Sequence, residues 1–211
     1  MTTAAAPAFW QANRWTLVIC AGLVLLNLGL LPGAPAWTAQ LLDGLQYDRQ
    51  AILDGEVWRL LTGNLVHWSL PHFALDVGVF LCVGLLWERQ VGPSYPWLLF
   101  GGGWAIGLAL LVCQPDLPWY RGLSGVASGQ FALALAIELA RGRREPWRCW
   151  YAAPAAIIFL LKIVCECGTG RLFFDTASLG DLGEPVPLAH AVGALTIPVL
   201  WSISLAAAQA A

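Results

Sequence analysis

RGLSGVASGQFALALAIELA, residues 121–140, places a serine between two glycines at the start of a mostly apolar run. Residues 122–140 are long enough to cross the hydrocarbon core of a bilayer as a helix. A serine at the beginning of such a helix has three interpretations: a small residue at a packing contact, a helix cap, or a nucleophile. The rest of the sequence discriminates among them.

The composition predicts a membrane protein built from helices. Of the 211 residues, 58% are hydrophobic and only 11% are charged, and the mean hydropathy is +0.66. A soluble domain of this length needs more charge to cover its surface. The apolar runs are continuous and show no alternation of period two, which argues against a β-barrel. The net charge of −2 provides no basic patch for nucleic acid.

Six segments are predicted to span the membrane as helices: 15–31, 70–87, 95–113, 122–140, 149–165 and 186–208. Residues 32–69 form a long first loop, and residues 166–185 form a second loop that is rich in glycine and acids. Since there is no internal repeat and no second domain, we expect residues 1–211 to form one all-α, six-helix membrane bundle.

The N-terminal region resembles a secretory signal peptide. Arg14 precedes an apolar run over 15–31, and a small-residue stretch follows at 34–36. The run is long for a signal peptide, and Arg14 is the only charge before it. We therefore expect an uncleaved first helix.

Basic residues near helix ends mark the cytoplasmic side of a membrane protein. The densest basic stretch is RGRREPWR, residues 141–148, between the fourth and fifth predicted helices. Arg14 and Arg89 fall on the same side. Both termini are therefore predicted to be cytoplasmic, and the first loop, 32–69, periplasmic.

This orientation places three polar side chains at one depth. Helices two, four and six begin at the outer face, and His72, Ser124 and His190 lie within about the first turn of these helices. Ionisable residues inside membrane spans usually face a partner or a wet cavity. Asp76 belongs with this group, whereas Glu138 and Lys162 are near span ends and are expected to reach the interface.

Ser124 and His190 supply a nucleophile and a base if helices four and six touch. Gly122, Gly125 and Gly193 remove side-chain bulk around these two residues. Free N–H groups at the start of a helix also favour an oxyanion. The alternatives are a glycine packing motif and a histidine bonded to a carbonyl at the interface.

The cysteines predict no metal site, and neither a metal nor a cofactor is expected. They show no metal-type CxxC pair and lie in or beside apolar runs, where we expect them to act as small apolar fillers. A disulfide at Cys165 or Cys167 requires that this end faces an oxidising compartment. The six are Cys20, Cys82, Cys113, Cys149, Cys165 and Cys167.

Residues 55–78, GEVWRLLTGNLVHWSLPHFALDVG, carry further motifs. With them the sequence resembles the rhomboid family of intramembrane serine proteases, whose pattern is W-R, H-x4-H-x3-N, G-x3-E-x3-G, G-x-S-G and A-H-x2-G in that order. Here the pattern corresponds to Trp58-Arg59; His67, His72 and Asp76; Gly84, Glu88 and Gly92; Gly122, Ser124 and Gly125; and Ala189, His190 and Gly193.

The resemblance implies that Ser124 is the nucleophile and His190 the general base and acid, as a dyad without a third acid. It implies that His72, the side chain at position 76 and the Ser124 backbone N–H bind the oxyanion. It also implies structural roles for His67, Trp58, Arg59 and Glu88.

Two positions depart from the family pattern. Asp76 stands where the family has Asn, and an ionised carboxylate would repel an oxyanion. Either burial keeps Asp76 protonated so that it donates, or a charged Asp76 holds His72 as an imidazolium that donates; we favour the second. At the other position Ser128 replaces the Tyr or His that relatives often carry.

The stretches YDRQAILDGEVWRLLTGNLVH and LLKIVCECGTG are similar to the bacterial rhombosortase branch. The resemblance implies a protease of the bacterial inner membrane whose site opens to the periplasm. Its partners would be exported proteins with a C-terminal transmembrane anchor and a glycine-rich sorting signal, cleaved through an acyl-enzyme. The alternatives are a catalytically inactive rhomboid-like binding factor and a transporter that uses Asp76 as a proton site, for which the expected repeats are absent.

Overall fold

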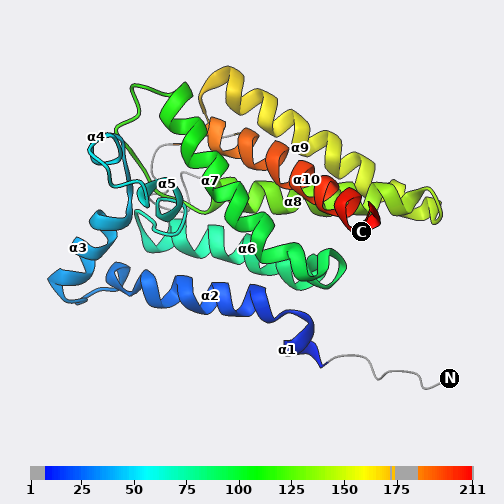
Figure 1. Ribbon diagram of the computed structural model, residues 1–211, viewed down its shortest axis with the longest axis horizontal. Helices are drawn as coiled ribbons and strands as arrows, with labels where there is room; N and C mark the ends of the chain where they lie inside the picture. The colour runs from blue at the N-terminus through cyan, green and yellow to red at the C-terminus, as the bar shows by residue number, and fades with distance from the viewer. Residues whose placement is uncertain (1–7, 172, 174–184, 211) are drawn as a thin grey trace.

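Five long helices and one shorter helix run back and forth in a bundle, with the small elements of the first loop gathered at one end (Figure 1). The structure is a computed structural model, and it describes residues 8–171, 173 and 185–210. In chain order the elements are α1 (Phe9–Ala12), α2 (Arg14–Leu26), η1 (Leu28–Leu30), α3 (Ala36–Leu45), β1 (Tyr47–Asp48), α4 (Arg49–Leu53), α5 (Arg59–Thr62), α6 (Leu70–Val91), η2 (Gly92–Ser94), α7 (Tyr95–Cys113), β2 (Trp119–Tyr120), α8 (Ser124–Gly142), η3 (Pro146–Arg148), α9 (Cys149–Thr169) and α10 (Pro187–Ala210).

The six predicted helices all form, but several of their ends differ from the prediction. The first was expected over 15–31 and ends at Leu26, because the Asn27 side chain donates to the carbonyls of Leu23 and Leu65 at 2.9 Å each. The second was expected over 70–87 and continues to Val91, where Gly92 at φ 79° ends it. The third agrees with its predicted bounds, 95–113.

The remaining helices differ from prediction mainly at their ends. The fourth was expected over 122–140 and runs over Ser124–Gly142. The sixth was expected over 186–208 and runs over Pro187–Ala210. The fifth was expected over 149–165 and continues to Thr169, with Gly170 in a left-handed cap. This last error arose because Glu166 was counted as part of a polar loop, whereas its side chain is buried inside the bundle.

Within the described residues, three stretches are long and apolar enough to cross a membrane: Leu70–Cys113, Pro146–Thr169 and Pro187–Gln209. The first contains both α6 and α7, which turn back on each other at η2 (Figure 1). α2 is a shorter apolar helix. These helices make the protein an integral membrane protein; the count of six spans stays a prediction.

α8 is the interior helix of the bundle. Ten of its 19 residues are buried, whereas the 21 residues of α9 include only two buried ones, Ala152 and Glu166. A helix that faces other helices rather than lipid does not need to be apolar throughout. This explains why α8 carries polar side chains such as Ser124, Gln130 and Glu138 and is absent from the apolar stretches above.

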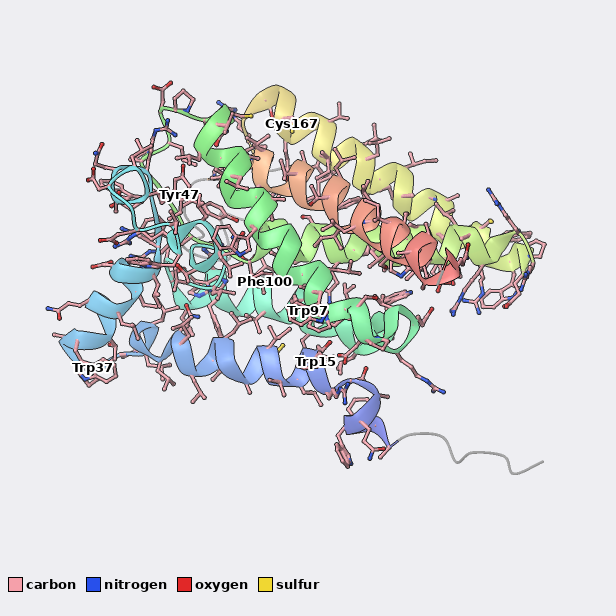
Figure 2. All side chains as sticks on the ribbon, viewed as in Figure 1. Trp15, Trp37, Tyr47, Trp97, Phe100 and Cys167 are labelled. Carbon is pink, nitrogen blue, oxygen red and sulfur yellow. The ribbon has the colours of Figure 1, made fainter. Side chains whose placement is uncertain are left out.

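The first loop, 32–69, is more ordered than the sequence indicated, because it contains α3, α4, α5 and a strand. β1 pairs antiparallel with β2, which lies just before α8, so that Tyr47 is opposite Tyr120. Arg59 ties the loop together by donating to the carbonyls of Asp43 at 2.7 Å and Gln46 at 3.0 Å. Figure 2 shows Tyr47 and Trp37 at this end, with Trp37 at the outer edge of α3.

Close contact between α8 and α10 depends on glycine. A Cβ placed on Gly193 would overlap the carbonyl oxygen of Gly125, and a Cβ on Gly129 would overlap the carbonyl oxygen of Gly193. A Cβ on Gly125 would lie 2.9 Å from the carbonyl oxygen of Ala189. Small residues let helix backbones approach closely in membrane proteins. This contact sets the positions of the first turns of both helices.

Glu88 joins α6 to the start of α2. Its two carboxylate oxygens accept from the backbone N–H groups of Trp15 at 2.9 Å and Thr16 at 2.7 Å. The first N–H groups of a helix have no partner within that helix, and they favour a negative charge. Glu88 therefore caps α2 from another helix.

Replacing Glu88 by alanine is expected to lower the free energy of unfolding by about 1.5–3 kcal/mol, because two backbone N–H groups, one buried and one partly buried, lose a charged acceptor. Thermal unfolding in mild detergent measures the change. The matched control is Arg89→Ala, an exposed neighbour on the same helix. Equal stability of both variants would contradict the capping role.

Candidate active site

Ser124 and His190 are brought together by the contact between α8 and α10. Ser124 is the first residue of α8, His190 lies in the first turn of α10, and Ser124 Oγ is 2.9 Å from His190 Nε2. His190 is buried and Ser124 is partly buried. The serine is not a side-chain cap, because Leu123 occupies the cap position of α8 and no side-chain cap bond is present there. Of the three interpretations of Ser124, this geometry favours the nucleophile.

The other ring nitrogen of His190 faces a carboxylate. His190 Nδ1 lies 2.8 Å from Glu166 Oε2 on α9, and Glu166 is only 1% exposed. The expectation of a dyad with no acid beside the base is therefore wrong for the geometry of this site. The i, i+4 spacing of Lys162 and Glu166 could have indicated that both lie on one face of a helix. It could not indicate that this face turns toward His190.

Lys162 and Glu138 were predicted to reach the membrane interface, but both side chains contact partners within the bundle. Lys162 Nζ lies 2.7 Å from Glu166 Oε2 and 3.3 Å from His190 Nδ1, so it belongs to the site. Glu138 is 4% exposed and contacts Arg148 Nη1 at 2.7 Å, Trp87 Nε1 at 3.2 Å and the Tyr151 hydroxyl. Each prediction failed because the charge has a partner within the bundle: Glu166 and His190 for Lys162, and Arg148 for Glu138.

Asp76 lies beneath the loop that leads into α8. Its Oδ2 accepts from the backbone N–H of Leu123 at 2.9 Å and lies 3.3 Å from His72 Nε2 and 3.4 Å from His67 Nε2. Three nitrogen groups converge on this one oxygen, and an ionised carboxylate can accept hydrogen bonds from all of them. Of the two alternatives for Asp76, the geometry favours the charged group paired with His72.

His67 lies in the loop before α6 and is fully buried. Its backbone N–H donates to Asn27 Oδ1 at 3.1 Å, and its ring packs edge-on against those of His72 and Phe73. Burial lowers the pKa of His67, and the nearby Asp76 carboxylate opposes this shift. These contacts connect the end of α2 with the start of α6.

Tyr120 also contacts the site, although no sequence pattern indicated that it would. Its hydroxyl donates to the carbonyl oxygen of Gly122 at 2.8 Å and lies against the Ser124 hydroxyl and the Gly125 backbone N–H. Burial raises the pKa of Tyr120, which keeps the hydroxyl protonated. Gly122 has φ 140°, and a Cβ there would lie 3.0 Å from His72 Nε2. The loop can therefore pass between Tyr120 and His72 only with glycine at this position.

The other residues singled out from the sequence lie away from Ser124. Trp58 and Arg59 are in the first loop, where the Trp58 indole lies 3.5 Å from the Gly44 carbonyl oxygen. Glu88 is near the opposite end of α6. Among the described residues, none of the contacts of these three side chains reaches Ser124 or His190.

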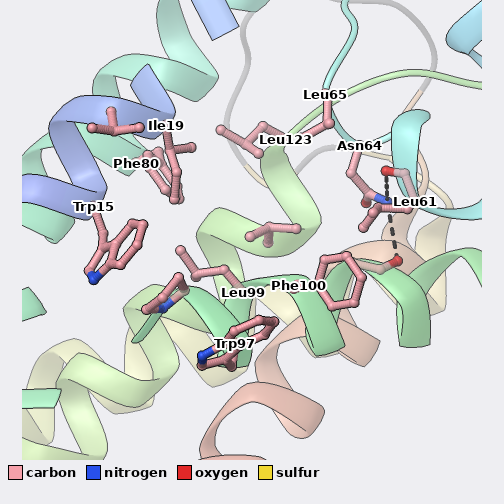
Figure 3. A pocket seen from close by; sticks show the side chains of 14 residues that line it. Trp15, Ile19, Leu61, Asn64, Leu65, Phe80, Trp97, Leu99, Phe100 and Leu123 are labelled. Atoms are coloured by element: carbon pink, nitrogen blue, oxygen red, sulfur yellow. Dashed lines mark hydrogen bonds between the residues drawn. The ribbon is translucent and has the colours of Figure 1, made fainter. Parts of the chain in front are cut away.

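An apolar cavity of about 400 Å³ lies next to the site, among α2, α5, α6, α7 and the start of α8 (Figure 3). Trp15, Trp97 and Phe100 line one side, and Leu123, the neighbour of Ser124, lines another. None of its 14 lining residues is acidic or basic. This cavity has no group that could perform acid–base chemistry.

In the part of the chain that the structure describes, no three His, Cys, Asp or Glu side chains are placed to hold a metal ion. All six cysteines are free thiols, and Cys165 and Cys167 are exposed near the end of α9 (Figure 2 labels Cys167). The absence of a metal and a cofactor stays a prediction.

Fold and site together define a class: integral membrane proteins built from helices in which a serine hydroxyl meets a histidine inside the bundle. Residues 54–201 match the family model for the Rhomboid domain. The chain therefore belongs to the rhomboid family, whose members are generally intramembrane serine proteases. A comparison with curated proteins found no match.

Proposed function

We propose that this protein is an intramembrane serine endopeptidase of the rhomboid type, with Ser124 as nucleophile and His190 as base. The observation that carries the proposal is the 2.9 Å separation of Ser124 Oγ from His190 Nε2 inside a helical bundle. A hydroxyl becomes a useful nucleophile when a positioned imidazole can take its proton.

The reaction proceeds in two halves. Ser124 Oγ attacks the carbonyl carbon of the scissile bond while its proton passes to His190 Nε2. The imidazolium then donates this proton to the leaving nitrogen as the C–N bond breaks, which leaves an ester on Ser124. A water molecule attacks the ester carbonyl, gives a proton to His190, and the proton returns to Ser124 Oγ as the acid is released.

The oxyanion is held at the start of α8. The first N–H groups of this helix have no partner within it, and the positive end of the helix dipole is beside Ser124. His72, one residue of the oxyanion set that the resemblance implies, has its Nε2 paired with Asp76. Asp76 acts by holding His72 and Leu123 in place rather than by donating itself.

We place the site near the periplasmic face of a bacterial inner membrane, with six spans and both termini in the cytoplasm. Ser124 begins α8 and Arg141 lies near its end, about 26 Å away along the axis at 1.5 Å per residue. This distance approaches the thickness of the hydrocarbon core. Trp37 and Trp119 are exposed at the Ser124 end, whereas Trp147 lies within the basic stretch and Trp150 just after it, as expected for two interfacial belts.

The proposed substrates are exported proteins with a C-terminal transmembrane anchor preceded by a glycine-rich segment, as in the rhombosortase branch. A buried serine can reach a peptide carbonyl only where the substrate helix unwinds, and glycine lowers the cost of unwinding by about 1 kcal/mol per residue relative to alanine. The second candidate function is an inactive rhomboid-like binding factor. It is favoured by Asp76, which stands at the family's Asn position and accepts from Leu123.

A cleavage assay in proteoliposomes tests the proposal. The substrate is a single-span protein with a glycine-rich junction at its outer end, and the matched substrate has leucine in place of each glycine. We expect cleavage of the first and at least about tenfold slower cleavage of the second, because leucine keeps the junction helical. Mass spectrometry of the products locates the cut. Binding of the glycine-rich substrate without any cleavage would support the inactive factor instead.

A further inference from the structure

We propose that Glu166 is the positioning residue of His190, which makes the site a Ser–His–Glu triad, and that Lys162 is the counterion of this carboxylate. The proposal deepens the proposed function and rests on it. It starts from one contact: Glu166 Oε2 lies 2.8 Å from His190 Nδ1, on the side of the ring opposite Ser124.

The contact with Glu166 selects the tautomer of His190. A carboxylate accepts hydrogen bonds and cannot donate them, so the ring nitrogen that faces Glu166 must carry the proton. Nε2, which faces Ser124 Oγ, then has the free lone pair that a general base requires. Without an acceptor at Nδ1, nothing in the described part of the site would hold the ring in this state.

Glu166 is held as a carboxylate by three donors. Lys162 Nζ lies 2.7 Å and His190 Nδ1 2.8 Å from Oε2, while the backbone N–H of Phe173 donates to Oε1 at 3.1 Å. A charge that is 99% removed from solvent is tolerated when it is paired and hydrogen-bonded. The Phe173 contact also fixes the carboxylate plane, since each oxygen has a separate partner.

The charges of the site balance at both stages of the reaction. In the resting site, the charges of Glu166 and Lys162 cancel, and a general base starts from the uncharged imidazole. In the tetrahedral intermediate, His190 becomes positive and the oxyanion is negative, so the sum is again zero. From the elements packed against it, His190 faces Ser124 on α8 and Glu166 and Lys162 on α9, while α7 contributes no carboxylate, amine or imidazole.

In a variant that lacks the Glu166 carboxylate, Lys162 is expected to lower the activity further by stabilising the wrong tautomer of His190. Its ammonium lies 3.3 Å from His190 Nδ1, and in the absence of the carboxylate it would donate to that nitrogen. The ring proton would then move to Nε2, which faces Ser124 and could no longer accept the hydroxyl proton. Removing Lys162 as well takes away this competing donor. The structure therefore predicts that the double variant is more active than the variant of Glu166 alone.

The kinetic test compares wild type with Glu166→Gln, Lys162→Met and the double variant in the proteoliposome assay. For Glu166→Gln we expect kcat to fall by about 10²–10⁴-fold with little change in KM, because wrong-tautomer variants of triads lose activity on this scale. The double variant is expected to recover at least about tenfold. Lys162→Met is expected to move the acidic limb of the pH–rate profile to higher pH, because removing a nearby cation makes the imidazolium easier to form.

Three kinetic results would overturn the proposal: a Glu166→Gln enzyme with wild-type kcat, a double variant no better than Glu166→Gln, or an unchanged acidic limb in Lys162→Met. Thermal unfolding of each variant reports folding. If Glu166→Gln does not fold, the acidic limb of Lys162→Met alone decides. Glu166→Asp keeps the charge and is expected to retain more activity than Glu166→Gln; equal losses in the two would count against the proposal.

A readout that does not need turnover separates this proposal from the proposed function. The chain has three histidines, so ¹⁵N NMR of histidine-labelled protein, assigned with His190→Ala, reports the tautomer directly. We expect a protonated Nδ1 and an unprotonated Nε2 at His190, reversed in Glu166→Gln. A protein with this tautomer that cleaves nothing would count only against the protease function. A wild-type His190 with its proton on Nε2 would overturn the role of Glu166.

Discussion

Ser124→Ala is expected to abolish cleavage of the glycine-rich membrane substrate. Removal of Oγ eliminates the acyl-enzyme, so only background hydrolysis remains. In a soluble serine protease the corresponding loss of kcat is about 10⁶-fold, and removal of serine and histidine together costs no more than removal of either alone. We therefore expect Ser124→Ala, His190→Ala and the double variant to have the same residual rate, measured as product formed per enzyme in proteoliposomes.

Ser128→Ala is the matched control for this prediction, because Ser128 lies one turn further along α8 and the contact with His190 is made by Ser124. It is expected to keep the wild-type rate and stability. The Ser128 position also departs from the family pattern, and the control shows whether its hydroxyl contributes to the rate. A Ser124→Ala protein that still cleaves the substrate would contradict the assignment of the nucleophile.

Gly193→Ala is expected to reduce activity by about 100-fold or more without removing any catalytic atom. The added carbon would overlap the carbonyl oxygen of Gly125. Backbone atoms cannot move aside by changing rotamer, so α8 and α10 must separate. A displacement of about 1 Å between catalytic groups can cost about 10²-fold in rate. Overpacking at such a contact also lowers the free energy of unfolding by about 1–3 kcal/mol.

The control for Gly193→Ala is Leu195→Phe, which adds volume on α10 where the side chain is 68% exposed. This variant is expected to match wild type in activity and in thermal unfolding, because the new ring meets lipid or detergent. A Gly193→Ala protein with wild-type activity would show that the close contact of α8 and α10 does not set the distance between Ser124 and His190.

Much of the fold could be predicted from the sequence because its signals are local. Continuous apolar runs predicted every long helix of the described residues, whereas the orientation inferred from charged residues near the helix ends stays a prediction. The ends of the helices were less predictable, since they depend on partners elsewhere. Asn27 ends α2 by bonding to Leu65, 38 residues away. The pairing of β1 with β2 joins two-residue strands that are separated in the sequence by α4, α5, α6 and α7, and no local pattern indicates it.

Some residues of the candidate site could likewise be predicted from the sequence, and others could not. Ser124 and His190 could be proposed as partners from their depth in the membrane and from their glycine neighbours, and the structure brings them together. Glu166 was missed because a carboxylate at the end of an apolar run is more often solvated than buried. Tyr120 was missed because its contact with Ser124 depends on how the loop folds back. Both depend on tertiary packing, which a single sequence does not display.

The most direct test of the central claim is the mass of the peptide that contains Ser124 after reaction of the intact protein with a fluorophosphonate. We predict one phosphonyl adduct, located on Ser124 by tandem mass spectrometry and absent from His190→Ala, because the reagent labels only a serine whose proton a neighbouring base can remove. A protein that acquires no adduct, or acquires it on another serine at the same rate with and without His190, would contradict the claim that these two side chains form a catalytic pair.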